Sequence, residues 1–460
     1  MKYISTRNSS KEYNFEQIFI KGLADDGGLF VPKSLKKFSS EELLNFKNLN
    51  YNELSTEIIN QFSSDFISRK ELSSLINKSY STFREKEVVK FSNVGEIKLL
   101  ELFHGPTLAF KDIAMQFIGN LYEYYLSKND EKINIVVATS GDTGAAAIDA
   151  IKGKSNLNIF VLHPNNKISS VQRKIMTTVE EKNVFNIAID GNFDDCQNIV
   201  KQMFSDLEFS KSINMSGVNS INWARIIAQS VYYFYTYFKL NSDKPISFSV
   251  PTGNFGDVFA GYLAKKMGLP VDKLIVATNQ NDILHRAISK GDYTSKKVEE
   301  TISPSMDIQI ASNFERLIYY VQNCNSDETN EIMKSINENK YTIDKLSLES
   351  IKKDFISESC SESEILEVIS EIFNKHNIIL DPHTAVGVGV AKKLKIDDKC
   401  VVLSTAHSCK FPDAIIKAIK KNTFLPDELK YILNKEERFH IIENNTEEVK
   451  KYIKEKINEN

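Results

Sequence analysis

One lysine in an apolar setting is the first residue in this chain that could do chemistry. Lys111 follows the apolar run 108–110 and lies between an expected strand, 98–103, and an expected helix, 112–125. Burial among apolar neighbours would lower the pKa of the lysine, and a neutral amine can attack a carbonyl carbon. The alternative is an ordinary lysine at a helix start, with its stem on the turn and its ammonium group in water. Lys111 is therefore a candidate Schiff-base lysine.

A glycine-containing loop follows the expected strand 133–139 and begins the next helix. Glycines let the backbone approach a ligand, while hydroxyl groups and the first helical N–H groups favour an anion. The loop is not a Walker A motif, because no Gly-Lys-Ser/Thr follows, and a plain capped turn is the alternative. The candidate ligand-binding residues here are Ser140, Gly141, Asp142 and Thr143.

A second strand-to-helix loop comes directly after the expected strand 246–251. Its two glycines would allow several backbone N–H groups to converge on one phosphate. The loop contains no lysine, so the phosphate is expected to be the handle of a cofactor rather than a reacting group. An ordinary tight turn is the alternative. The candidate residues are Gly253, Asn254, Phe255, Gly256 and Asp257.

A hydroxyl group and two cationic segments complete the candidate set. Thr405 ends the strand expected at 400–405, where its hydroxyl could bond a heteroaromatic nitrogen. Lys167, near Ser169 and a helix start, could hold a phosphate. Asn222 and Arg225 share one helical face, and arginine suits bidentate contact with a phosphate or carboxylate. Structural ion pairs are the alternative for both cations.

The elements that must position these residues alternate between strands and helices from about residue 95 onward. Continuous apolar strands separated by helices indicate parallel sheets that are covered on both faces. We expect an α/β protein with two parallel-sheet lobes and a cleft between them, where ligands bind beyond the carboxyl ends of strands. The expected parts are a mainly helical N-terminal domain (1–93), a smaller lobe with Lys111 (94–240), a larger lobe with the phosphate loop (241–436) and a charged tail (437–460).

Composition excludes several other classes of protein. The 460 residues include 58 basic and 61 acidic side chains, which gives no electrostatic footprint for nucleic acid. No apolar run reaches the roughly 18 residues of a membrane span, and the first residues lack a signal-peptide core. Five scattered cysteines show neither metal-ligand spacing nor a disulfide framework, so we expect no metal and a cytoplasmic location.

The motifs together resemble the threonine synthase family, in its bacterial and fungal branch. They occur in the family's order over almost the whole chain, and their combination is very specific. They are G-L-F-V-P (28–32), F-H-G-P-T-x-A-F-K-D (103–112), T-S-G-D-T-G-A-A (139–146), N-S-I-N-x-x-R (219–225), V-P-T-G-N-F-G-D (250–257) and T-A-H (405–407).

The resemblance implies a fold-type II enzyme, related to the tryptophan synthase β subunit, that uses pyridoxal 5'-phosphate. It would convert O-phospho-L-homoserine and water to L-threonine and phosphate, the last step of threonine biosynthesis. Lys111 would hold the cofactor and move protons, residues 253–257 would bind the cofactor phosphate, and Thr405 would face the pyridine nitrogen. Residues 140–143 would line the substrate carboxylate and the 3-hydroxyl side of the cofactor, and Lys167, Ser169, Asn222 and Arg225 would bind the substrate phosphate.

Other readings of the same motifs stay open at this point. A related phospholyase or a serine/threonine dehydratase could share the cofactor apparatus, and a non-catalytic descendant could keep the fold. The wider fold type commonly has asparagine in place of Asp142, which leaves the contact to the cofactor 3-hydroxyl open. The sequence is compatible with a monomer or a homodimer.

Overall fold

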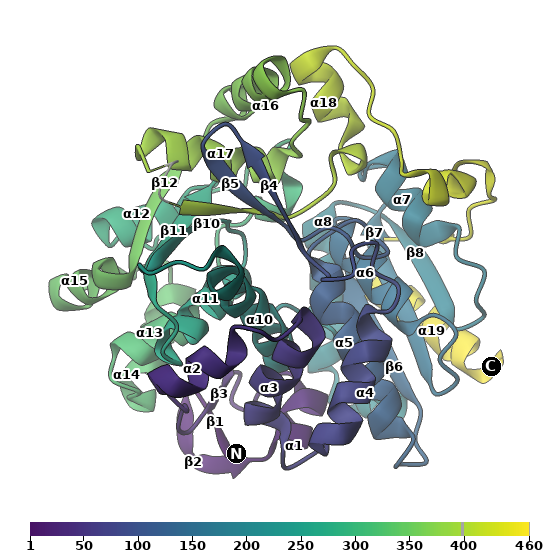
Figure 1. Ribbon diagram of the computed structural model, residues 1–460. Helices are drawn as coiled ribbons and strands as arrows, with labels where there is room; N and C mark the ends of the chain where they lie inside the picture. Colours follow the sequence, from purple (N-terminus) through teal and green to yellow (C-terminus); the bar gives the residue numbers. More distant parts are fainter. Residues whose placement is uncertain (397–399, 460) are drawn as a thin grey trace.

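The computed structural model describes residues 1–396 and 400–459, which form two α/β lobes and an N-terminal region (Figure 1). In this part of the chain the strands make three sheets, with the orders β2-β1-β3, β12-β11-β10-β13-β5-β4 and β14-β8-β7-β6-β9. The strands are β1 Tyr3–Ser5, β2 Asn8–Tyr13, β3 Phe30–Pro32, β4 Lys90–Val94, β5 Ile97–Glu101, β6 Ile133–Ala138, β7 Leu157–Pro164, β8 Val184–Asp190, β9 Met215–Ser216, β10 Ile246–Pro251, β11 Val271–Thr278, β12 Phe355–Ser359, β13 Cys400–Ser404 and β14 His440–Glu443.

Helices cover both faces of the two large sheets. In Figure 1, α16, α17 and α18 lie above the six-stranded sheet, whereas α10, α11 and α13 lie below it. The helices are α1 Phe15–Lys21, α2 Ser40–Phe46, α3 Tyr51–Ser63, α4 Arg69–Tyr80, α5 Lys111–Leu126, α6 Asp142–Ile151, α7 Ser170–Thr177, α8 Phe193–Ser205, α9 Leu207–Ser212, α10 Trp223–Leu240, α11 Gly256–Lys266, α12 Ile283–Lys290, α13 Phe314–Val321, α14 Ser326–Asn337, α15 Lys345–Asp354, α16 Glu362–His376, α17 Pro382–Lys393, α18 Pro412–Ile419 and α19 Thr446–Glu459. Three 3-10 turns, η1 Pro304–Met306, η2 Ser408–Lys410 and η3 Asp427–Asn434, lie in the connections.

The expected α/β class and its parallel sheets are confirmed. β6, β7 and β8 pair in parallel in the smaller sheet, and β5, β13, β10, β11 and β12 pair in parallel in the larger one. These central strands are buried along nearly their whole length, as expected for strands covered on both faces.

Strand pairing crosses the expected lobe bounds in two places. β5 leads into the Lys111 segment, but it hydrogen-bonds to β13 in the larger sheet, and β4 adds antiparallel to its outer edge. Near the other end of the chain, β14 adds in parallel to β8 of the smaller sheet. The chain therefore passes between the lobes just before Lys111, while the division at 93, 240 and 436 stays a prediction.

Several regions contain strands that the sequence did not indicate, including β14 in the expected charged tail. The N-terminal region contains a three-stranded antiparallel sheet beside its helices, and β12 extends the larger sheet after the charged helices α14 and α15. β2 has only one buried residue and β12 stands at a sheet edge, so neither shows a clear buried pattern.

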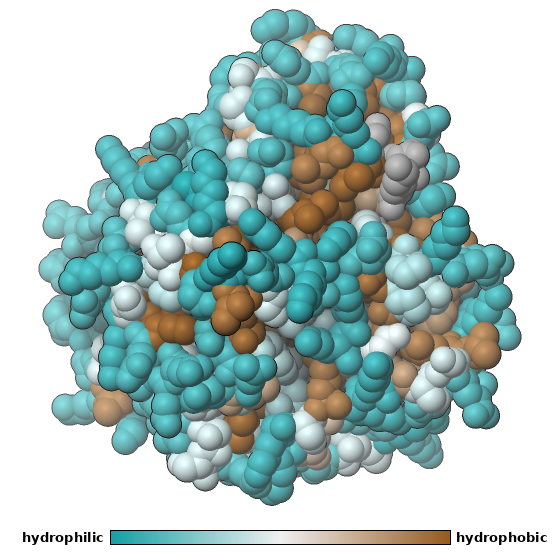
Figure 2. Space-filling model, turned by 90° about the vertical axis from the view of Figure 1, so that its left-hand side faces the viewer, coloured by the Kyte–Doolittle hydropathy of each residue, from teal (hydrophilic) through white to brown (hydrophobic). Residues whose placement is uncertain are grey.

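Figure 2 shows a mostly hydrophilic face of the molecule. Polar and charged side chains cover most of the face shown in Figure 2, and apolar side chains form smaller patches among them. Among the residues described, none of the helices combines the length and apolar character needed to cross a membrane.

Candidate active site

The turn that leads to Lys111 is fixed to the end of β13. The Phe110 N–H donates to the Thr405 carbonyl at 2.8 Å, and the His407 N–H donates to the Leu108 carbonyl at 3.0 Å. Ala109 and Ala406 form an isolated antiparallel bridge between these two bonds. The lysine turn and the Thr405 turn therefore form one unit, although nearly 300 residues separate them in the chain.

Asp112 holds the inner side of the same turn. The backbone N–H and the hydroxyl of Thr107 both donate to its carboxylate, at 2.8 and 2.5 Å. A Cβ atom at Gly105 would lie 2.4 Å from the Cβ of Asp112, so the G-P-T sequence wraps tightly around this side chain. Burial raises the pKa of Asp112 to about 6.

Lys111 is the first residue of α5 and is buried, at 8% exposure. Its Nζ atom lies 3.2 Å from Asp142 Oδ2 and 3.3 Å from Ser305 Oγ. Burial lowers the pKa of Lys111, and the charges of Lys410 and Arg225 act in the same direction, against the attraction of Asp142. This is the direction expected for a lysine that must become a neutral nucleophile.

Asp142 begins α6 and is an acceptor for four side chains, including Ser305, whose Oγ donates to Oδ2 at 3.4 Å. Its Oδ1 atom accepts from Lys410 Nζ at 2.6 Å and from Gln172 Nε2 at 2.9 Å, while Oδ2 faces Lys111. Burial opposes its ionisation, but the nearby Lys111 and Lys410 charges keep the pKa of Asp142 well below its usual value. Asp142 is therefore an anion, and it lies between two lysines.

The loop before α6 needs glycine at position 141. Gly141 has a φ of 133°, and a Cβ atom there would lie 2.7 Å from the Gln172 side chain. Its N–H donates to Thr139 Oγ1 at 2.9 Å, which folds the loop back on the end of β6. Ser140 and Thr143 are only partly buried, whereas Gly141 and Asp142 between them are buried.

The loop from Gly253 to Gly256 presents its backbone at the start of α11. No side chain caps this helix, and Gly253, Asn254 and Gly256 are partly or fully exposed. Phe255 has a φ of 63° and is buried against the Phe314 ring, which anchors the loop from below. Exposed glycines before an uncapped helix start are the arrangement that binds a phosphate through backbone N–H groups.

Asp257 does not direct its carboxylate toward this loop. Its Oδ1 atom accepts from the hydroxyls of Tyr232 and Tyr233 on α10. Burial raises the pKa of Asp257 to about 6. The backbone N–H of Asp257 at the helix start is therefore the part of the residue that could bind a phosphate. Its side chain links α11 to α10.

Arg225, on the first turn of α10, is a buried cation with few partners. It is 4% exposed, its Nε atom has no hydrogen-bond partner, and Nη1 lies 3.5 Å from the Val218 carbonyl. Burial lowers the pKa of Arg225 to about 10. Asn313 donates to the carbonyls of Ser220 and Asn254, so the segment before Arg225 lies beside the phosphate loop. A buried guanidinium with an unused donor is the arrangement expected of an anion site.

The other predicted ligands of the substrate phosphate cap helices or lie on an exposed loop. Asn222 caps α10 by accepting from the Ala224 N–H, and its amide donates to the Phe19 carbonyl. Ser169 caps α7, and its hydroxyl donates to the Lys410 carbonyl at 2.7 Å. Lys167 lies on an exposed loop. Of these four residues, Arg225 is the one whose charge reaches Lys111.

Thr405 stands where the sequence placed it, at the end of β13 and beside the lysine turn. It is 5% exposed, and its N–H donates to Thr384 Oγ1 at 3.2 Å. Thr384 in turn bonds Asp381, which also bonds His383. This layer at the start of α17 supports Thr405 from behind.

Sequence reasoning missed Lys410, Gln172 and Ser305, which contact Asp142 or Lys111. The sequence position of Lys410 gives a weak indication of a role in the site, since the residue follows Thr405 by five positions in the loop after β13. Ser305 lies in a long connection without regular pattern, and its carbonyl would be 2.4 Å from a Cβ atom at Gly253. These contacts are tertiary, and neighbouring residues in the chain do not encode them.

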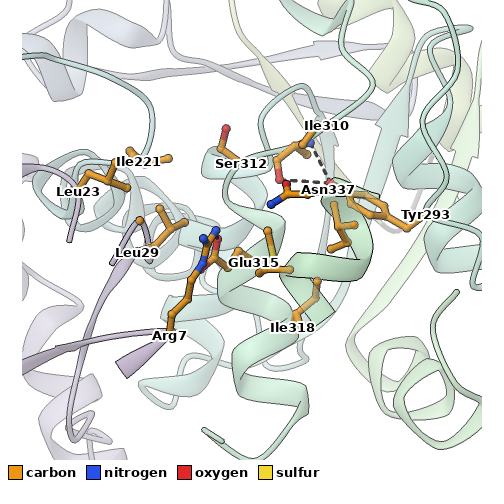
Figure 3. Close-up of a pocket in the computed structure, with 14 residues that line it drawn as sticks. Arg7, Leu23, Leu29, Ile221, Tyr293, Ile310, Ser312, Glu315, Ile318 and Asn337 are labelled. Atoms are coloured by element: carbon orange, nitrogen blue, oxygen red, sulfur yellow. Dashed lines mark hydrogen bonds and ion pairs between the residues drawn. The ribbon is translucent and has the colours of Figure 1, made fainter. Parts of the chain in front are cut away.

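A separate pocket of about 240 Å³ lies between the N-terminal region and α13 (Figure 3). Arg7 and Glu315 form an ion pair of 2.8 Å in its wall, and Ile221 lines it from the segment before α10. None of the predicted site residues lines this pocket, so it is distinct from the Lys111 site.

Comparisons with known proteins show the family to which the chain is similar. The family described as "Threonine synthase N terminus" matches residues 2–80, "Pyridoxal-phosphate dependent enzyme" matches 92–406, and "Threonine synthase, C-terminal" matches 384–453. The chain is 43% identical to a threonine synthase of Pseudomonas aeruginosa, with 98% of each chain covered.

Two solved structures give the same result. A threonine synthase from Brucella melitensis, solved with pyridoxal phosphate bound, superposes with a TM-score of 0.95 at 42% identity and 99% coverage of both chains. The yeast enzyme superposes with a TM-score of 0.93 at 41% identity, covering 100% of this chain and 99% of that one. The chain belongs to the threonine synthase family of pyridoxal-phosphate-dependent enzymes.

Proposed function

We propose that this protein converts O-phospho-L-homoserine and water to L-threonine and inorganic phosphate, with Lys111 as its catalytic residue. The observation that carries the proposal is the buried Lys111 amine, which faces Asp142 and is joined through its own turn to Thr405. Burial lowers the pKa of this lysine, as Schiff-base chemistry requires.

The residues present fit pyridoxal 5'-phosphate. Lys111 would hold it covalently, the loop Gly253–Gly256 with the Asp257 backbone would bind its phosphate, and Thr405 would face its ring nitrogen. The uncapped, partly exposed start of α11 supports the phosphate assignment. When bound, the cofactor would withdraw electrons from the substrate carbon next to the amino group.

Proton transfer would fall to Lys111. Once the substrate amine takes its place, the freed amine can remove the proton at Cα and then one at Cβ. It needs to be neutral for this task, and the pKa shift caused by burial favours that form. Lys111 must pass on the Cα proton before it takes the one at Cβ. After phosphate has left Cγ, a proton returns to Cγ, which becomes the methyl group. Addition of the water hydroxyl at Cβ and return of a proton to Cα would complete the sequence.

Arg225 is our preferred ligand for the departing phosphate, with Lys167 as a second cation. Arg225 is buried and has an unpartnered Nε atom, so its charge is fixed before the reaction starts. Preorganised charge stabilises a leaving dianion without rearrangement during bond cleavage. Ser140, Gly141 and Thr143 would bind the substrate carboxylate through hydroxyl and backbone donors, beside Asp142.

The alternative enzymes, a phospholyase or a serine/threonine dehydratase, differ in product. The test incubates the purified protein and pyridoxal phosphate with O-phosphohomoserine and measures threonine, phosphate and 2-oxobutyrate. We expect threonine and phosphate in equal amounts, and neither from Lys111→Ala. Phosphate with 2-oxobutyrate and no threonine would overturn the proposal. Lys417→Met, on the exposed face of α18, is the matched lysine control.

We also propose a cytoplasmic location for this activity. Cys196, Cys324, Cys360 and Cys409 are free thiols in the described part of the chain, as suits a reducing compartment. Fractionation of the source cells, with the enzyme found at the membrane or outside the cell, would contradict this.

A further inference from the structure

Lys410 joins three loops that come from both lobes. It follows β13 of the larger sheet, and its Nζ atom binds Asp142 Oδ1, at the start of α6 in the smaller lobe, at 2.6 Å. The same Nζ atom donates to the Thr107 carbonyl in the lysine turn at 2.9 Å. Its own carbonyl accepts from Ser169 Oγ. No role follows for this lysine from the proposed reaction.

Lys410 is placed to serve another residue rather than a ligand. Its side chain has no exposed surface, and two acceptors in the protein already bind its ammonium group. An ammonium group without exposed surface, with two of its three donors already bound, is not placed to contact a substrate phosphate. Its effect must therefore pass through Asp142 or the Thr107 turn.

The arrangement places one carboxylate between two ammonium groups. Lys410 binds Oδ1 of Asp142 at the shorter distance, and Lys111 reaches Oδ2 at 3.2 Å. If Lys410 were absent, the buried carboxylate would have Lys111 as its single lysine partner and would hold that lysine in its charged form. With Lys410 present, Asp142 is neutralised from the side away from Lys111.

We propose that Lys410 is a positioning residue that neutralises and orients Asp142, and so allows Lys111 to lose its proton. This inference rests on the function proposed above. The pKa shifts agree with it, because the Lys410 charge acts to lower the pKa of Lys111 and that of Asp142.

Other charged groups also change the pKa values of Lys111 and Asp142, and the test must separate their effects from that of Lys410. Arg225 on α10 also lowers the pKa of Lys111, and His383 on α17 lowers that of Asp142. The positive charge of Lys410 also acts to lower the pKa of Asp112 and that of Cys409. All four remain in the variants below, so differences between variants report on Lys410 and Asp142.

The test compares Lys410→Met, Lys410→Arg and Asp142→Asn with the wild-type holoenzyme and with Lys417→Met. Two readouts are taken against pH: the visible absorbance of the bound cofactor, which responds to the Lys111 nitrogen, and kcat for threonine formation. We expect Lys410→Met to raise the midpoint of the absorbance titration by about one pH unit, since a cation is lost. Asp142→Asn should lower the midpoint, and Lys410→Arg should keep it close to wild type.

Shifts of opposite sign separate this role from a structural one, since general loosening of the site would not produce them. The inference fails if Lys410→Met lowers the midpoint or leaves it unchanged, or if Asp142→Asn does not lower it. Where Lys410→Met does not fold, Lys410→Arg and Asp142→Asn decide by the same criteria. A wild-type protein that makes no threonine would overturn the proposed function instead, and the absorbance titration would still test Lys410.

Discussion

Replacing Gly253 by alanine tests how closely the cofactor loop must approach its neighbour. The new Cβ atom would lie 2.4 Å from the Ser305 carbonyl oxygen, whereas ordinary contact begins at 3.4 Å, so the two segments must separate by about 1 Å. Ser305 Oγ contacts Lys111 Nζ at 3.3 Å, and the Ser305 N–H donates to His383. The displacement therefore reaches the catalytic amine.

A misplacement of about 1 Å costs roughly 100-fold in rate, which corresponds to about 2.7 kcal/mol. We expect Gly253→Ala to lose about that factor in kcat/KM and to bind pyridoxal phosphate more weakly, as measured by absorbance titration of the apoenzyme. Gly217→Ala is the control, since its Cβ atom would meet the side chain of the partly exposed Phe204 at 3.2 Å and no backbone atom closer than 3.8 Å. Wild-type affinity and turnover in Gly253→Ala would refute the reasoning.

Two further predictions concern buried charges. Arg225→Met should lose about 100-fold or more in kcat/KM for O-phosphohomoserine, because a preorganised cation at the leaving phosphate is lost. Arg225→Lys should recover part of this activity. Near wild-type kinetics in Arg225→Met would exclude Arg225 from the phosphate site. Asp257, with a pKa raised to about 6, holds its proton more tightly when folded, so its contribution makes the free energy of unfolding fall as pH rises from about 4 to about 6. Over that window denaturant unfolding of the apoenzyme should show the wild type losing about 2 kcal/mol more than Asp257→Asn. Equal slopes for the two proteins would contradict this.

Local sequence was sufficient to predict the loops of the site. In the segments around Gly141 and Gly253, an apolar strand, a glycine turn and a helix follow one another directly, so the chain itself encodes the geometry. The setting of Lys111 was predictable for the same reason, since the turn before it is apolar. The glycines of the V-G-V-G-V-A run at 386–391, in α17, are explained by packing, because a Cβ atom at Gly387 would lie 2.9 Å from Val402.

Tertiary contacts were not predictable from neighbouring residues. Lys410 and Asp142 are 268 positions apart and meet because the loops after β13 and β6 lie against each other. The carboxylate of Asp257 faces the α10 tyrosines, which no motif indicates. β2 was missed because its sequence, Asn-Ser-Ser-Lys-Glu-Tyr, lacks the alternating apolar pattern of a half-buried strand.

The central claim is that the protein replaces a phosphate group by water through cleavage of a carbon–oxygen bond. The most direct measurement runs the reaction on O-phosphohomoserine in ¹⁸O-labelled water and determines the label in both products by mass spectrometry. We predict one labelled oxygen in the hydroxyl of threonine and none in the phosphate at the moment of release. Labelled phosphate with unlabelled homoserine would show simple ester hydrolysis and would contradict the account.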